Sequence, residues 1–379
     1  MPRPEPPPAA PALAHVSALD GVRGIAVLAV LFHHFIGVGA QVLPGPRAFF
    51  RVAEAGWLGV DLFFVLSGFL ITRILLETRT RPGYYRNFYA RRSLRIFPLY
   101  YVTLAIVLAL VAWVEPASSD GRYLVAHQGW LWIYATNFLA AFSGNHLASG
   151  WFSVNHFWSL AIEEQFYLAW PSVVRRLRRE HLVIVAVAVA LLSIALRLLV
   201  RYTLGSRYAY LLTFARLDGL MIGALLALAW TPGQALRPLG VSTRTLGALG
   251  AAAIVVVVVL RGGFSRTDAL VQLAGYPACA LVGAWLIGEA TAPTSSWVRR
   301  ALEARGLVFF GTYSYGLYVF HGVLRPLLAD RLGHYAGGHD PRLVWPIFLG
   351  ASFAIALALA LVSYHLMEKP LLGLRRRFA

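Results

Sequence analysis

Long apolar segments alternate with short polar ones along almost the whole chain. Ten segments approach the length of about 20 apolar residues that a membrane-spanning helix needs. They lie at 22–38, 57–77, 93–114, 157–174, 182–200, 210–230, 245–261, 269–288, 306–328 and 344–366. The pattern predicts an all-α, polytopic integral membrane protein with about ten transmembrane helices.

Basic residues determine how these segments cross the membrane, because Lys and Arg concentrate in cytoplasmic loops. Three clusters are predicted to be cytoplasmic: Arg79, Arg81, Arg86, Arg91, Arg92 and Arg95; Arg175, Arg176, Arg178 and Arg179; and Lys369, Arg375, Arg376 and Arg377. Ten crossings, with both termini in the cytoplasm, place all three basic clusters on the cytoplasmic side. An eleventh apolar segment, 130–142, is short for a span, and we expect it to be re-entrant or interfacial.

Composition narrows the class of protein. The chain has 379 residues, of which 58% are hydrophobic and 13% charged, with a mean hydropathy of +0.63. These values exclude a soluble enzyme, a disordered chain and a disulfide scaffold. The net charge of +17 follows from topology and does not indicate nucleic-acid binding. Cys279 is the one cysteine, so neither an internal disulfide nor a cysteine-based zinc site can form.

The chain is expected to form one membrane domain. Residues 1–18 are rich in Pro and Ala without an apolar core, which predicts a disordered tail and not a signal peptide. Residues 19–372 contain all ten predicted spans and show no internal repeat, and 373–379 form a basic cytoplasmic tail.

Ionisable side chains at membrane depth are candidate functional residues, because each costs about 2.5–3.5 kcal/mol to insert. Arg23 lies at the cytoplasmic start of the first predicted span, and His34 follows eleven residues later. That spacing is three helical turns plus about 20°, so both share one face about 17 Å apart. His33 points about 100° away, and the sequence leaves open which histidine acts.

Four other ionisable residues reach the same outer half of the membrane. Glu163 and Glu164 enter from the outside, as does Asp61, and His321 reaches a similar level from the inside. If the helices bring these faces together, a carboxylate would orient His34 as a general base, with Asp61, His33 and His321 as supporting residues. Two structural alternatives stay open: His34 as an interhelical hydrogen-bond partner, and a glutamate as the ion-pair partner of Arg216 or Arg197.

Arg92 and Arg95 are three residues apart, so they share a helix face at the cytoplasmic start of a span. Two guanidinium groups in this arrangement can hold a phosphate, although positive-inside anchoring explains them equally well. The chain has no Walker loop and no HExxH motif, and Ser67 lacks a GxSxG context. Gly219 and Gly223 form a GxxxG pattern that predicts a packing face.

Seven segments together resemble the membrane acyltransferase 3 family, whose members include bacterial O-acetyltransferases. They are LDGVRGIAVLAVLFHH at 19–34, GVDLFFVLSGFLIT at 59–72, FYARRSLRIFPLYY at 88–101, HFWSLAIEEQFYLAWP at 156–171, RLDGLMIGALLA at 216–227, YSYGLYVFH at 313–321 and SYHLMEKPL at 363–371. Their order and spacing, more than any single segment, carry the resemblance.

The resemblance implies a membrane O-acyltransferase in a bacterial inner (plasma) membrane. The family's R-x10-H pattern falls on Arg23 and His34, with His34 as the proposed base. Its RxxR pattern falls on Arg92 and Arg95, which would bind acyl-CoA together with Arg23. Its acidic pair falls on Glu163 and Glu164. Acyl-CoA, taken to be acetyl-CoA, would be a co-substrate, and neither a bound cofactor nor a metal is implied.

The acceptor stays open, because no sugar-binding pattern is recognisable. Glycan repeat units, peptidoglycan, exopolysaccharide, lipid-linked sugars and macrolides all fit the resemblance. Some relatives carry an additional SGNH-type domain that this chain lacks, so we expect it to act alone or with a separate envelope partner protein. A proton-coupled transporter or flippase is the alternative from another class, since buried His and Glu residues also suit a proton relay. The lack of repeat symmetry and of paired broken helices argues against it.

Overall fold

The computed structural model describes residues 16–39, 47–144, 147–231, 234–336 and 340–378. This part of the chain is a bundle of helices without a β-strand, apart from an isolated bridge between Ala148 and Ser153. The predicted all-α class is therefore confirmed. The expected disorder of residues 1–18 falls almost wholly outside the described residues, and α1 begins at Ser17.

The helices differ widely in length. The longer ones are α1 (Ser17–Gly39), α3 (Leu58–Thr78), α4 (Tyr84–Val114), α8 (Trp158–Arg176), α9 (Arg179–Thr203), α11 (Leu217–Ala229), α12 (Thr243–Arg261), α13 (Tyr276–Thr291), α17 (Arg325–Ala336) and α18 (Pro341–Ser363). The shorter ones are α2 (Arg47–Glu54), α5 (Ser119–Ala126), α6 (Gly129–Trp132), α7 (Thr136–Phe142), α10 (Ser206–Leu211), α14 (Trp297–Leu302), α15 (Arg305–Thr312), α16 (Ser314–Val323) and α19 (Lys369–Gly373). Short 3-10 or π turns are η1 (Ala55–Trp57), η2 (Asn155–Phe157), η3 (Thr213–Ala215), η4 (Pro238–Gly240), η5 (Val271–Gly275), η6 (Tyr364–Glu368) and η7 (Leu374–Phe378).

Within the described residues, seven helical segments are long and apolar enough to cross a membrane. They are Ser17–Ile36, Phe50–Thr78, Tyr84–Val114, Arg179–Thr203, Thr243–Arg261, Val271–Thr291 and Val344–Gly373. Each coincides with one of the ten predicted spans, which supports a polytopic membrane protein. The remaining three predicted spans fall on α8, which carries two glutamates, and on two segments that are divided into shorter helices. The count of ten and the cytoplasmic location of both termini stay predictions.

The expectation of unbroken spans is wrong at 210–230. Helix α10 ends at Leu211, Leu212 is extended (φ −77°, ψ 132°), and α11 begins only at Leu217. A break at this depth frees carbonyl groups that need hydrogen-bond donors. Asn137 donates to Leu211 O (3.2 Å) and Arg197 donates to Ala215 O (2.9 Å). Both donors come from distant helices, so the local sequence carries no signal of the break.

Two further segments are divided. The predicted span 306–328 consists of α15, α16 and α17, with interruptions at Tyr313 and Leu324. Residues 130–142 form parts of α6 and α7, and between them lies Tyr134, whose φ of 54° is incompatible with a continuous helix. Neither α6 nor α7 reaches the length of a span.

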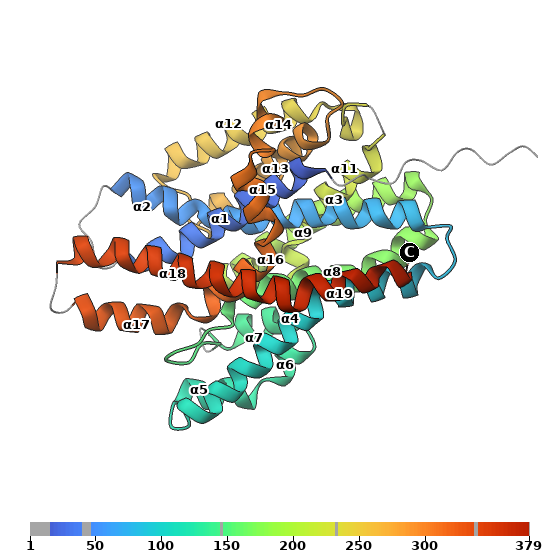
Figure 1. Ribbon diagram of the computed structural model, residues 1–379. Coiled ribbons are helices and arrows are strands. Elements are labelled where there is room, and N and C mark those ends of the chain that lie inside the picture. Colours follow the sequence, from blue (N-terminus) through green and yellow to red (C-terminus); the bar gives the residue numbers. More distant parts are fainter. Residues whose placement is uncertain (1–15, 40–46, 145–146, 232–233, 337–339, 379) are drawn as a thin grey trace, which may run out of the picture.

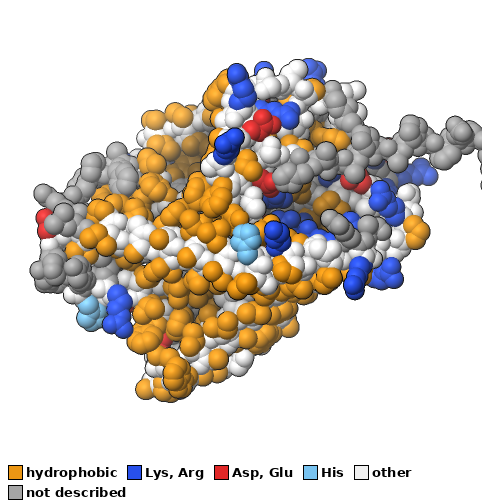
Figure 2. Space-filling view, viewed as in Figure 1, with side chains coloured by type: hydrophobic (Ala, Val, Ile, Leu, Met, Phe, Trp, Pro, Cys, Tyr) orange, Lys and Arg blue, Asp and Glu red, His pale blue; other side chains and the backbone are white. Residues whose placement is uncertain are grey.

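Helix α3 occupies the centre of the bundle, in contact with α1, α8, α11 and α13. In Figure 1 the turn between α3 and α4 and the C-terminus lie at the right-hand end, whereas α2 and the start of α18 lie at the left-hand end. Figure 2 shows hydrophobic side chains over most of the body of the molecule and basic ones mainly toward the right and the top. Large apolar residues such as Trp113 and Leu168 are exposed on this body, as expected of a surface that contacts lipid.

Glycines allow α3 and α11 to approach closely. A Cβ atom added at Gly68 would lie 1.9 Å from Leu220 O, and one added at Gly223 would lie 2.0 Å from Val65 O. Both distances are far below van der Waals contact, so the two backbones touch only because these residues lack side chains. The packing role predicted for the GxxxG pattern is thus confirmed at Gly223, whereas Gly219 has more space (3.4 Å to Phe64 Cβ).

We predict that Gly223→Ala destabilises the protein by about 1–3 kcal/mol, because the added methyl group must push α3 and α11 apart. Gly219→Ala is the matched control on the same helix and should change stability much less. Thermal unfolding of the detergent-solubilised protein measures both. Equal melting temperatures for the two variants would contradict the assigned helix contact.

Candidate functional site

A basic pocket, which we call the inner arginine pocket, opens where the start of α4 meets the C-terminal segment. Its volume is about 1200 Å³. Six arginines and no carboxylate are among its lining residues: Arg23, Arg81, Arg91, Arg92, Arg95 and Arg375. Such an excess of positive charge around one cavity is a site for a polyanion.

The local helix geometry explains the gathering of these arginines. Arg91 and Arg92 precede Arg95 on α4 by four and three residues, so all three face the same pocket. The C-terminal segment is held against them, because Arg91 Nε donates a hydrogen bond to Phe378 O (2.7 Å).

Arg375 completes the pocket from the C-terminal segment. Its Nε is buried, with no hydrogen-bond partner among the described residues. Burial, together with the charges of Arg92, Arg91 and Arg23, lowers the pKa of Arg375 to about 10. An anion in the pocket would give the buried Nε an acceptor and would offset the repulsion among the arginines. Sequence reasoning did not select Arg375 for the site, because a basic tail is explained by its predicted cytoplasmic location alone.

A second cavity, which we call the middle pocket, continues from the first toward the centre of the bundle. It shares Arg23, Leu70, Arg92 and Arg95 with the inner arginine pocket, and its volume is about 770 Å³. Its other lining residues include Ser67, Ser159, Glu163, Tyr167, Tyr315 and Tyr318. The walls therefore change from strongly basic to polar and aromatic across two adjoining pockets.

Glu163 faces this middle pocket. Its carboxylate accepts hydrogen bonds from Ser67 Oγ (3.1 Å) and Tyr167 Oη (3.0 Å). The Arg92 guanidinium lies 4.7 Å from the centre of the Tyr167 ring. Glu164 does not line this pocket, and its buried Oε1 has no hydrogen-bond partner in the described part of the chain. Among the described residues neither glutamate hydrogen bonds to a histidine, so the expected contact between a glutamate and His34 is absent from this structure.

Asp61 takes part in a buried ion-pair network instead of joining the histidines. Arg216 donates to Asp61 Oδ1 (2.7 Å), and Arg197 donates to both oxygens of Asp218 (2.9 Å each). All four side chains are almost completely buried. The alternative that Glu163 or Glu164 pairs with Arg216 or Arg197 is therefore wrong. The acidic partners are Asp61 and Asp218, and Asp218 follows Arg216 by two residues in the sequence.

Four histidines gather beyond Tyr318, on the other side of the middle pocket. Ring centres lie 5.1 Å apart for His33 and His34, 4.9 Å for His34 and His321, and 5.0 Å for His156 and His321. Among the described residues, no group of three or more His, Cys, Asp or Glu side chains is arranged to hold a metal ion. The structure thus brings His34 and His321 together as expected, and it adds His156, which sequence reasoning did not select.

Hydrogen bonds determine which nitrogen atom of each ring carries a proton. His321 Nδ1 lies 2.7 Å from Tyr318 O and 3.2 Å from Leu317 O, and carbonyl oxygens only accept, so Nδ1 is the donor. In the neutral ring, His321 Nε2 is then an acceptor. His34 Nδ1 lies 3.1 Å from both His321 Nε2 and Val30 O, so it carries a proton as well.

It follows that Nε2 of neutral His34 has a free lone pair. This tautomer is assigned from the hydrogen-bond pattern. Fixing the proton on one ring nitrogen leaves the other available to accept a proton from a substrate. His321 therefore does for His34 what we expected a carboxylate to do: it orients the ring.

Two side chains separate the histidines from the middle pocket. Ser159 and Tyr318 line the pocket, and their hydroxyl oxygens lie 2.5 Å apart. Tyr318 Oη also donates to His156 O (2.9 Å), while its backbone carbonyl holds His321. The lining of the pocket does not include His34, so in this conformation the cavity ends one side chain short of the histidines.

Comparison with known proteins gives a consistent result. A family model described as an acyltransferase domain, Acyl_transf_3, matches residues 16–362. The chain is 27% identical over 375 residues to the O-acetyltransferases OatA of Staphylococcus aureus strains NCTC 8325 / PS 47 and COL. These matches cover 94% of this chain and 57% of each relative, so the chain spans little more than half the length of those proteins. No solved structure matches it.

We predict that Asp61→Asn destabilises the protein by about 3–5 kcal/mol, because it leaves the charge of Arg216 buried without a partner. The control is Asp330→Asn, which removes an exposed carboxylate beside His334 and should have little effect. Thermal unfolding in detergent distinguishes the two. If Asp61→Asn unfolds at the wild-type temperature, the network is not what holds α3 to α11.

Proposed function

The chain belongs to the acyltransferase 3 family, and from that premise we propose that it is a membrane O-acyltransferase. It would move an acyl group from cytoplasmic acyl-CoA to a hydroxyl group of a cell-envelope glycan or a related acceptor. We propose that this acyl group is acetyl. One observation carries the proposal: a pocket lined by six arginines continues into a polar cavity that ends beside a pair of hydrogen-bonded histidines.

The inner arginine pocket suits the nucleotide end of the donor. Coenzyme A carries a diphosphate and a third phosphate, and guanidinium groups bind phosphate oxygens in bidentate fashion. Arg92 and Arg95 face the pocket from α4, and Arg23 faces it from α1, where it is also paired with Asp20. Donor binding is the role expected of these three arginines from the sequence, with Arg375 now added to them.

The middle pocket suits the pantetheine arm. That arm presents amide N–H groups, carbonyl oxygens and a hydroxyl group, which need both acceptors and donors. Glu163 and the oxygen atoms of the Ser67 and Tyr167 hydroxyls would accept from N–H groups. The guanidinium groups of Arg92 and Arg95 would donate to carbonyl oxygens. We therefore assign Glu163 to donor binding and not to proton transfer, and we give Glu164 no role.

The chemical step would use His34 as the general base. Its Nε2 takes the proton from the acceptor hydroxyl, whose oxygen attacks the thioester carbonyl carbon. The carbon–sulfur bond breaks, an ester bond forms, and the proton on His34 passes to the departing thiolate to give free coenzyme A. For the thioester to reach His34, the contact between Ser159 and Tyr318 must open.

Location and partners follow from the same premise. The curated relatives are named O-acetyltransferases and come from a bacterium, which supports acetyl as the transferred group and the bacterial plasma membrane as the location. Donor made in the cytoplasm would enter at the arginine end, while the acceptor would reach His34 from outside. A separate envelope protein as partner stays part of the proposal. The structure removes one argument against a transporter, because the predicted spans 210–230 and 306–328 are both broken. Consumption of acyl-CoA distinguishes the two functions, since a transporter would move its substrate without it.

We predict that acetyl-CoA binds saturably to the detergent-purified protein, and that Arg92→Ala/Arg95→Ala weakens its affinity at least about tenfold through loss of charge-assisted contacts. Arg86→Ala is the matched control, because Arg86 is exposed on the same helix and does not line the pocket. Isothermal titration calorimetry measures all three. Absence of binding by folded wild-type protein would favour the transporter hypothesis.

We predict that His34→Ala abolishes acyl transfer and leaves donor binding intact. His321→Ala should lower kcat and change its pH profile, because His34 would lose its fixed tautomer. His321→Gln should restore much of the rate, since its amide can donate to Tyr318 O and accept from His34 Nδ1. Release of free thiol from acetyl-CoA in the presence of acceptor measures transfer. Wild-type kcat and pH profile in His321→Ala would contradict the role of His321.

A further inference from the structure

Two hydroxyl groups stand between the middle pocket and the histidines, and in the mechanism so far they form only a barrier. Ser159 on α8 and Tyr318 on α16 both line the pocket, and their hydroxyl oxygens lie 2.5 Å apart. Both also approach one backbone carbonyl: His156 O is 2.9 Å from Tyr318 Oη and 3.4 Å from Ser159 Oγ. All three residues are buried. We call Ser159 and Tyr318 the hydroxyl pair.

The hydroxyl pair has two hydrogen atoms to share with one carbonyl oxygen. A separation of 2.5 Å between two hydroxyl oxygens requires a hydrogen atom between them, because their lone pairs would otherwise repel each other. The second hydrogen goes to His156 O, and the shorter distance assigns it to Tyr318. Ser159 therefore donates to Tyr318 Oη, an assignment made from the hydrogen-bond pattern. Since a serine hydroxyl can rotate, its hydrogen can turn to another acceptor while Tyr318 stays bonded to the backbone.

The carbonyl group that holds the hydroxyl pair is itself fixed. His156 Nε2 donates to Val319 O (2.9 Å), which ties this residue to α16. The fit is close, because a Cβ atom added at Gly322 would lie 2.3 Å from His156 Nδ1. Tyr318 is thus held from both ends, by its own helix and by His156 O. A donor supported in this way needs little reorganisation at the moment of reaction, which is what stabilisation of a transition state requires.

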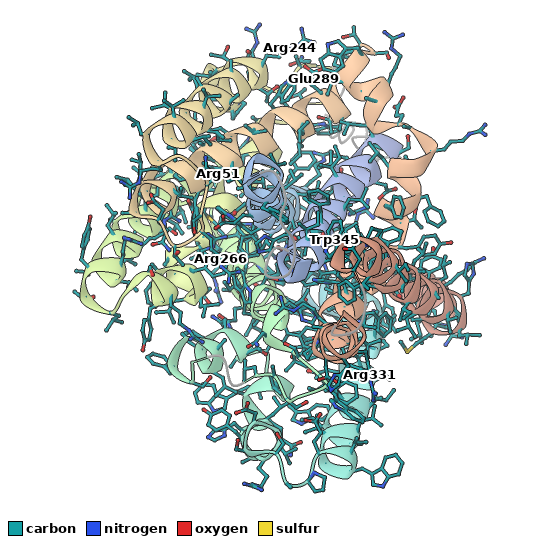
Figure 3. All side chains as sticks on the ribbon, turned by 90° about the vertical axis from the view of Figure 1, so that its left-hand side faces the viewer. Arg51, Arg244, Arg266, Glu289, Arg331 and Trp345 are labelled. Atoms are coloured by element: carbon teal, nitrogen blue, oxygen red, sulfur yellow. The ribbon has the colours of Figure 1, made fainter. Side chains whose placement is uncertain are left out.

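The hydroxyl pair lies on the donor side of the histidines. Ring centres are 5.4 Å apart for Tyr318 and His321, and 4.9 Å apart for His321 and His34. His33, the neighbour of the base, contacts α2, where its Nδ1 lies 3.2 Å from a backbone carbonyl oxygen. Figure 3 views the molecule from the end where α2 lies and labels Arg51 on that helix. A thioester carbonyl that arrives from the middle pocket would therefore meet the hydroxyl pair before His34.

We propose that Ser159 is the oxyanion donor of the acyl-transfer reaction and that Tyr318 is the residue that positions it. When the acceptor oxygen attacks the thioester, the electron pair of the C=O bond moves to the carbonyl oxygen, and the Ser159 hydrogen turns from Tyr318 to that oxygen. The C=O bond re-forms as the C–S bond breaks, and Ser159 keeps its proton throughout. This inference rests on the proposed function and deepens it: opening the contact both admits the thioester and frees a hydrogen-bond donor for it.

A second pair of hydroxyl groups in the middle pocket suits this role less well. Ser67 and Tyr167 also lie 2.5 Å apart, but both contact Glu163, whose carboxylate would repel a developing negative charge. Tyr315 already donates its hydrogen to a backbone carbonyl oxygen (2.6 Å). Ser159 is therefore the hydroxyl donor that the pocket offers away from a carboxylate and beside the histidines.

Infrared spectroscopy tests this hydrogen bond directly. Acetyl-CoA that is isotopically labelled at the thioester carbonyl carbon is bound to the detergent-purified protein, and its C=O band is compared with that of free acetyl-CoA. We expect a shift to lower wavenumber in the wild type, because a hydrogen bond weakens the C=O bond. Ser159→Ala should lose most of that shift. The measurement needs no turnover and therefore no identified acceptor.

Thiol release from acetyl-CoA, with water as the acceptor, measures the effect on the reaction. Ser159→Ala should lower kcat about a hundredfold, the loss expected when one oxyanion donor is removed, with little change in KM. Tyr318→Phe should lower kcat less, since Ser159 keeps its hydroxyl group but loses its support. The double variant should be no slower than Ser159→Ala, because no donor is left to position. Losses that multiply in the double variant would contradict the positioning role of Tyr318.

Ser314→Ala is the matched control, because Ser314 is a buried serine that lines the same pocket one helical turn before Tyr318. It should keep the wild-type band and rate. Thermal unfolding in detergent checks that every variant folds. If Ser159→Ala does not fold, Ser159→Cys replaces it, and its weakly donating thiol should also lose most of the shift.

Three results would overturn the inference. They are an unshifted band in the wild type, a wild-type band in Ser159→Ala, and an acetyl group on Ser159. Mass spectrometry after incubation with acetyl-CoA alone detects the third, which would make Ser159 a nucleophile and not an oxyanion donor.

Donor binding distinguishes failure of this inference from failure of the proposed function. Calorimetric titration with acetyl-CoA is run on the same samples. Folded wild-type protein that does not bind acetyl-CoA would contradict the proposed function itself. Binding without a shift of the C=O band would contradict only the role of Ser159.

Discussion

Two buried ion pairs join three helices near the centre of the molecule. Arg216 pairs with Asp61 across α11 and α3, and Arg197 pairs with Asp218 across α9 and α11. A charge at this depth is tolerated only when a partner of opposite sign meets it with good geometry, so the pairs determine how these helices dock. The Gly68 and Gly223 contacts then allow α3 and α11 to approach to backbone distance. Residues on α3 that line the middle pocket owe their positions to this contact.

Around this fixed centre, charge is distributed unevenly along the bundle. Arginines line the pocket at one end, polar and aromatic side chains line the middle, and the histidines lie beyond Tyr318. In the proposed function, the phosphates of the donor would bind at the arginine end, and the histidines would lie at the far end of its pantetheine arm. Ser159 and Tyr318, which are in contact with each other, belong to the wall of the middle pocket, and Tyr318 also holds His321.

The histidine cluster shows how the ring of His34 is oriented without a carboxylate. Backbone carbonyl groups of α16 hold the proton on His321 Nδ1, and His321 in turn holds the proton on His34 Nδ1. A carboxylate would have performed the same orientation while adding a buried negative charge, with its desolvation cost. The chain avoids that cost by using neutral groups, and Glu163 lies apart from the histidines, on the wall of the middle pocket.

The sequence by itself determined the all-α membrane class, the family, and the residues at membrane depth, because hydrophobic length and charge clusters are properties of the chain alone. It also placed Arg92 and Arg95 on one face, because helical periodicity is local. Only the tertiary structure decided which side chains on different helices contact each other. Depth along a helix follows from residue count, but the direction a side chain faces depends on how helices rotate against each other. Hence Asp61 pairs with Arg216, His34 forms a hydrogen bond with His321, and Glu163 accepts one from Tyr167. The breaks in 210–230 depend likewise on donors from remote helices, which no local pattern can reveal.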